Sequence, residues 1–76
     1  MNAVRKLFAE TLKVPPESIS DETSIENTEA WDSLKHMELI VGIEKLFDVI
    51  LDGDEIALMI SVPAVEAVLK KKGVEI

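Results

Sequence analysis

The sequence predicts an all-α fold: a small four-helix bundle with a long loop between its first two helices and a short third helix. Apolar residues recur at helical spacing in separate stretches, and prolines, an Asp-Gly turn and good capping residues separate those stretches. The only strand-like run, residues 49–51, is too short to compete with the helical pattern. A length of 76 residues allows one small domain, so we expect a single domain over residues 1–76.

The first helix is predicted over residues 3–13, where one face is apolar. Pro15 and Pro16 follow and should end it, because proline disfavours the α conformation in the residue before it. A polar loop then extends to Asp32, and loops this long are functional or held down by their own side chains. The helix face consists of Val4, Leu7, Phe8 and Leu12, and the apolar residues of the loop are Ile19, Ile25 and Trp31.

The second helix is predicted over residues 33–48, with Asp32 as its N-cap. Its apolar arc should face the core and comprises Leu39, Ile40, Ile43, Leu46, Phe47 and Ile50. The opposite arc mixes apolar and charged residues: Leu34, Met37, Glu38, Val41, Glu44, Lys45 and Asp48. This outer arc is either surplus hydrophobicity covered by the long loop or a docking surface with an apolar patch and an acidic rim.

Two shorter helices are predicted after the Asp-Gly turn. Asp54 should cap the third, over residues 55–60, and Ser61 should cap the fourth, with Pro63 in its first turn. The buried stripe of the fourth helix is expected to be Val62, Val65, Val68 and Leu69. Three lysines at residues 70–72 suit its C-terminal end, and Gly73 should terminate it.

Composition excludes several classes of function. Fifteen acidic residues against eight Lys and Arg give a net charge of −7, which argues against a nucleic-acid partner. No apolar run is long enough to insert into a membrane, and residues 1–12 lack the apolar core of a signal peptide, so we expect a cytoplasmic protein acting as a monomer. Without cysteine the chain has no disulfide, zinc cluster or thiol of its own.

Ser33 is the candidate functional residue. With Asp32 it could be merely a capping pair at the start of the second helix. The same position also favours an anion, since free backbone N–H groups and the helix dipole meet there, and a phosphate ester on Ser33 would be stabilised.

His36, the only histidine, follows Ser33 by three residues, but no second histidine, nucleophile elbow or oxyanion site accompanies the pair. We therefore expect no catalytic residues and place His36 at the mouth between helices. A calcium loop at residues 48–54 is rejected because Ile50 and Met59 would fall at ligand positions, so no metal site is expected.

Asp32-Ser33-Leu34, followed by Glu38-Leu39 and Phe47, resembles the attachment motif of acyl carrier proteins. The segment 14–19 resembles the loop entry of many carriers, and the segment 21–25 resembles the one before their attachment site. The resemblance extends along nearly the whole chain and implies the acyl-carrier-protein-like four-helix fold.

The resemblance also implies a function. Ser33 would bear 4'-phosphopantetheine, attached covalently from coenzyme A by a phosphopantetheinyl transferase, and Asp32 would assist that transfer through a divalent metal at the transferase. The thiol of the arm would hold acyl groups as thioesters for acyl-loading and acyl-transferring enzymes, which explains the missing cysteine. Partner enzymes would bind the surface formed by Leu34, Met37, Glu38, Val41 and Glu44.

Some residues depart from the family pattern. Lys35 and Lys45 make the second helix less negatively charged than in that pattern, and Trp31 occupies a position where a small residue is usual. These departures favour a specialised carrier over housekeeping fatty-acid synthesis and leave polyketide or other biosynthesis open. Two alternatives also stay open: a peptidyl or aminoacyl carrier, although its usual Gly-Gly motif is absent, and a helical interaction module without a prosthetic group.

Overall fold

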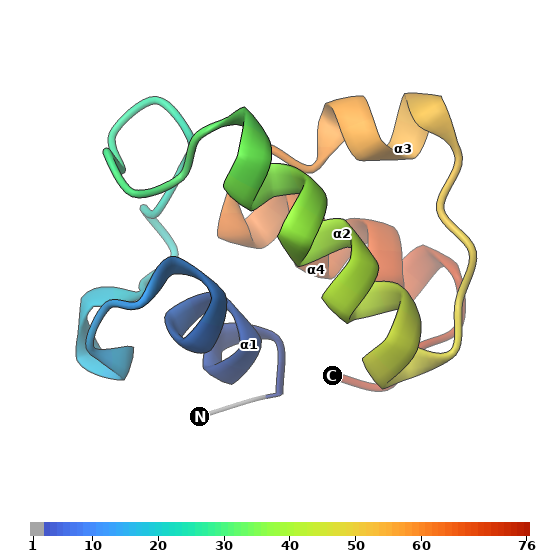
Figure 1. Cartoon of the computed structure of the whole chain (residues 1–76). Helices are drawn as coiled ribbons and strands as arrows, with labels where there is room; N and C mark the ends of the chain where they lie inside the picture. The colour runs from blue at the N-terminus through green and yellow to red at the C-terminus, as the bar shows by residue number, and fades with distance from the viewer. Residues whose placement is uncertain (1–2) are drawn as a thin grey trace.

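The computed structural model describes residues 3–76, and Figure 1 shows the path of the chain. This part of the chain forms four α-helices and one short 3₁₀ turn, and its only β-type pairing is an isolated bridge between Ser24 and Ser61. The predicted all-α fold is confirmed. Met1 and Asn2, which belong to the predicted domain, lie outside the described residues. The elements are α1 (Ala3–Leu12), η1 (Pro16–Ser18), α2 (Ser33–Phe47), α3 (Gly53–Leu58) and α4 (Val62–Lys71).

The core gathers apolar side chains from α1, α2, α4 and the long loop. Phe8 of α1, Leu39 and Ile43 of α2 and Leu69 of α4 are fully buried within it. Gly42 allows α1 and α2 to approach closely, because a Cβ atom there would lie 3.1 Å from Cδ1 of Leu7. The predicted inner faces of α1 and α4 are confirmed, with Leu7 and Val68 only partly buried at their margins.

The ends of α1 and α2 differ slightly from the prediction. Both helices finish one residue early because the next residue, Lys13 or Asp48, adopts the left-handed conformation (φ 58° and 53°). The following N–H then bonds to the carbonyl five residues back, from Val14 to Ala9 in the first case, which satisfies free helix carbonyls. The prolines therefore lie beyond the end of α1 rather than at it.

The predicted core arc of α2 is correct only in its first half. Leu39, Ile40 and Ile43 are buried, whereas Leu46 is half-exposed and Ile50 is 85% exposed. Ile50 lies beyond the left-handed turn after α2, so helical spacing no longer sets the direction of its side chain. Leu46 borders a groove that α1 lines with Ala3, Lys6, Leu7 and Glu10, and these residues cover it incompletely. Phe47 is partly buried against the core.

The long loop is held to the bundle by its own side chains, which is one of the two possibilities that its length indicated. Ile19 and Trp31 are buried, and Ile25 packs against the core. Backbone bonds add to this, since the Ile25 N–H donates to the Ile60 carbonyl and the Val62 N–H donates to the Thr23 carbonyl. The loop is therefore fixed to the start of α4.

An ion pair fastens the loop from the other side. Arg5 of α1 binds Asp21 in the loop and lies 3.6 Å from Glu66 of α4. These carboxylates raise the pKa of the Arg5 guanidinium, chiefly through its hydrogen bond to Asp21. Arg5 thus joins α1, the loop and α4.

The start of α3 corrects a second prediction. Asp52 caps it rather than Asp54, and the helix covers Gly53–Leu58 instead of residues 55–60. Asp52 accepts from the Glu55 N–H at 2.8 Å while the Glu55 carboxylate accepts from the Asp52 N–H at 3.0 Å, a reciprocal capping box. The box requires an acidic residue three positions after the cap, and Asp52 is the aspartate that has one.

The cap of α4 is as predicted, because Ser61 accepts from the Ala64 N–H. Gly73 ends the helix with φ 89°. Among residues 3–76, none of the helices combines the length and apolar character that crossing a membrane requires.

Candidate functional site

Ser33 is the first residue of α2, and its side chain is exposed to solvent. Asp32 before it is extended (φ −103°, ψ −173°) and accepts from the Lys35 N–H at 2.9 Å, which confirms it as the N-cap. The backbone N–H groups of this first helical turn make a partial positive charge beside the serine hydroxyl. An exposed hydroxyl at such a position is accessible to an enzyme and compatible with an anionic phosphate.

Trp31 fixes the chain just before the serine. Its side chain is 2% exposed, and its ring packs edge-to-face on Phe8 of α1, with centroids 5.0 Å apart and planes at 71°. Two residues later the chain is at the surface, so Trp31 is buried beneath the site while Ser33 remains uncovered.

His36 links the loop, α2 and α3. Its Nδ1 accepts from the indole Nε1–H of Trp31 at 3.1 Å, and its Nε2 lies 2.9 Å from the carbonyl oxygen of Ile56 in α3. Both ring nitrogens therefore have partners other than Ser33, and neither is available as a base for the serine hydroxyl. The predicted place of His36, between helices at their mouth, is confirmed.

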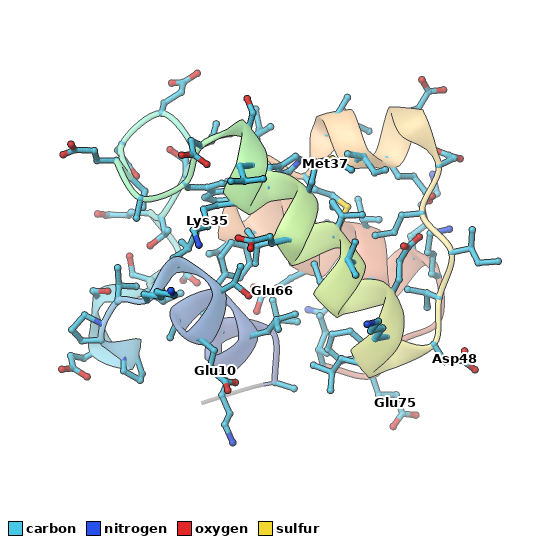
Figure 2. All side chains as sticks on the ribbon, in the orientation of Figure 1. Glu10, Lys35, Met37, Asp48, Glu66 and Glu75 are labelled. Atoms are coloured by element: carbon cyan, nitrogen blue, oxygen red, sulfur yellow. The ribbon has the colours of Figure 1, made fainter. Side chains whose placement is uncertain are left out.

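The outer arc of α2 is exposed next to Ser33. Leu34 is 70% exposed, and Met37 and Val41 are about half-exposed, so the long loop does not cover them. Figure 2 shows Met37 and Lys35 on opposite sides of α2. Lys35 pairs with Glu38 at 3.1 Å, one helical turn away. An apolar strip with charges beside it thus follows Ser33 along the helix.

Glu44 differs from the other residues of this arc. It is only partly exposed, and its Oε2 accepts from the Leu51 N–H at 3.0 Å, which ties the turn after α2 back to the helix. Its carboxylate has a structural contact that the sequence analysis did not anticipate.

Two further apolar side chains were missed by the sequence analysis. Leu58 at the end of α3 is 64% exposed and Ile60 just after it is nearly half-exposed. Figure 1 shows that the C-terminal end of α3 lies toward the N-terminal half of α2. The short α3 gives too few residues for helical spacing to distinguish its outer from its inner side, so no sequence signal identified them.

Comparison with known proteins decides the family. A family model described as "Phosphopantetheine attachment site" matches residues 2–69. The chain is also 39% identical over 70 residues to the acyl carrier protein of Desulforapulum autotrophicum, a match that covers 90% of this chain and 91% of that protein. The chain belongs to the acyl carrier protein family. Members of this family are carriers rather than catalysts, and they bear phosphopantetheine.

The residues of this acyl carrier family member fit that group. The start of α2 offers an exposed hydroxyl, the positive end of a helix dipole and a clear surface above the buried Trp31. Within the described part of the chain, no group of three or more His, Cys, Asp or Glu side chains is arranged to hold a metal ion.

Proposed function

We propose that Ser33 carries the 4'-phosphopantetheine arm. The observation that supports this most directly is the exposed Ser33 side chain at the N-terminus of α2, in a chain of the phosphopantetheine attachment family. A phosphate bound to its oxygen would lie beside the free N–H groups of the first turn. In the transfer, the Ser33 oxygen forms one bond to phosphorus, the pyrophosphate bond of coenzyme A breaks, and adenosine 3',5'-bisphosphate leaves. The serine proton goes to the transferase or to solvent.

The arm gives the carrier its chemistry. It ends in a thiol, which the chain itself lacks, and this thiol would hold acyl groups as thioesters. A flexible tether raises the effective concentration of the acyl group at each partner's active site. We place this carrier in fatty-acid, polyketide or other specialised biosynthesis. Asp32, adjacent to Ser33 and exposed, would assist the transfer through the divalent metal of the transferase.

The partner surface in this proposal is the exposed strip of α2. Leu34, Met37 and Val41 supply apolar contact, and Glu38 supplies a negative charge that orients basic partners. Glu44 lies at the margin of this surface, with its carboxylate already bound to the Leu51 N–H.

Intact mass tests the proposal. After incubation with coenzyme A and a broad-specificity phosphopantetheinyl transferase, the wild-type chain should gain the mass of one phosphopantetheine group. Ser33→Ala should gain none, because the accepting oxygen is absent. Lack of addition to a folded wild-type chain would favour the interaction module without a prosthetic group.

The partner surface predicts the effect of reversing one charge. Glu38→Lys should raise the KM of the transferase for the carrier about fivefold, because like charges would face each other at the interface. Its unfolding free energy should change by less than about 1 kcal/mol, since the Lys35–Glu38 pair is exposed.

Glu10→Lys is the matched control for this variant. It makes the same charge reversal at an exposed residue of α1, which Figure 2 shows at the opposite end of the view from Met37, and it should leave the KM unchanged. Equal effects of the two variants would mean that only net charge matters, and the proposed surface would be wrong.

A further inference from the structure

The short helix α3 has little apolar anchorage of its own. None of its six residues is buried, and Ile56 is the one that packs against the core. Leu58 is directed to solvent. The buried apolar anchors of this segment flank the helix instead, with Leu51 before it and Met59 after it. The polar contacts that α3 itself makes therefore help to set how the helix lies between these two anchors.

One polar contact fixes the beginning of α3. The Glu55 carboxylate lies 2.9 Å from the Lys72 ammonium at the end of α4. The pKa of Glu55 is lowered, first by the Asp52 N–H and then by Lys72, so the carboxylate is ionised at neutral pH. This contact holds the side of α3 that is remote from Ser33.

His36 fixes the other half of α3. The carbonyl of Ile56 lies in the last turn, where it accepts from the Met59 N–H at 3.3 Å, and His36 Nε2 is 2.9 Å from the same oxygen. The indole N–H of Trp31 can only donate, so Nδ1 must accept. The proton of the neutral imidazole is therefore on Nε2, which donates to the Ile56 carbonyl.

We propose that His36 is a positioning residue that sets the place of α3 beside the first turns of α2. The hydrogen bond from Nε2 to Ile56 sets where the exposed Leu58 lies relative to Leu34 and Met37 of α2, whereas the loop holds Ile60 through the Ile25 N–H. The effect of this hydrogen bond on partner binding rests on the proposed function, whereas the hydrogen bond itself does not.

Two conservative variants separate the bonds of His36. In His36→Asn the amide oxygen lies near the position of Nδ1 and can accept from Trp31, but no donor reaches Ile56. In His36→Gln the amide nitrogen reaches the position of Nε2 and can donate to Ile56. The proposal requires that the glutamine variant behave like the wild type and that the asparagine variant differ from it.

Hydrogen exchange of the unmodified protein tests the contact without reference to function. The Ile56 and Met59 N–H groups, which bond within and just after α3, should exchange about tenfold faster in His36→Asn than in wild type or His36→Gln. The Val65 N–H in α4, bonded to Ser61, is the internal control and should not change. Unchanged exchange in α3, equal acceleration at Val65, or a glutamine variant that behaves like asparagine would each overturn the proposal.

Transferase kinetics then test the consequence for the surface. His36→Asn should raise the KM for the carrier about fivefold with kcat within about twofold of wild type, and His36→Gln should restore the KM. A fall in kcat with unchanged KM would overturn the positioning role. If the wild type is not modified at all, the proposed function fails, while the exchange result still decides whether His36 positions α3.

Discussion

Trp31→Ala is expected to lower the free energy of unfolding by about 3–5 kcal/mol, the usual cost of truncating a buried tryptophan to alanine. The side chain is 2% exposed and packs on Phe8, and its indole N–H donates to His36. Small domains have total stabilities of about 5 kcal/mol, so the variant should keep at most about 2 kcal/mol and unfold at a much lower urea concentration than wild type. Urea titration followed by far-UV circular dichroism measures this, because the chain has no other tryptophan for fluorescence.

Trp31→Phe is the matched control for the packing effect. It keeps an aromatic ring against Phe8 and removes the donor to His36, so we expect a loss of about 1–2 kcal/mol and a folded protein. A loss below about 1 kcal/mol in Trp31→Ala would mean that Trp31 does not anchor the chain before Ser33.

Asp32→Asn is expected to slow attachment of phosphopantetheine roughly 10- to 100-fold while leaving the fold intact. Asparagine is as good an N-cap as aspartate, so the bond to the Lys35 N–H should persist. The lost negative charge removes the proposed contact with the metal of the transferase, and charged contacts of this kind contribute about 1.5–3 kcal/mol. Initial rates of conversion, measured by mass at saturating coenzyme A, give the comparison.

Asp32→Ala separates capping from transfer. It removes both the cap and the charge, so it should be as slow as Asp32→Asn and also lose about 0.5–2 kcal/mol of stability. Conversion of Asp32→Asn at the wild-type rate would restrict Asp32 to capping.

Much of this fold follows from local patterns in the sequence. The faces of α1 and α4 and the caps Asp32 and Ser61 depend on spacing and on side-chain oxygens next to free N–H groups. The ends of α1 and α2 do not, because Lys13 and Asp48 take a left-handed conformation that glycine usually provides. Of these three left-handed helix ends, only the one at Gly73 after α4 was predictable, because that residue is a glycine.

The candidate site also has features that the sequence predicts and features that it does not. The outward direction of Leu34 and Met37 follows from their place on the helix wheel and is confirmed. Ser33, which was singled out by its position at the helix start, is exposed as well. Contacts that join distant segments have no local signature: the bond from His36 to Ile56 spans 20 positions, and that from Leu51 to Glu44 spans seven. Such contacts depend on how the chain after Phe47 turns back toward α2, which spacing along one helix cannot reveal.

Locating the attached group on the chain is the most direct test of the central claim. Fragmentation of the modified wild-type protein in a tandem mass spectrometer distinguishes Ser33 from Ser18 and Ser20, which are also exposed but lie in the long loop. Ser33, at the start of α2, should carry all of the added phosphopantetheine. Recovery of the group on Ser18, Ser20 or any other residue of the chain would contradict the account.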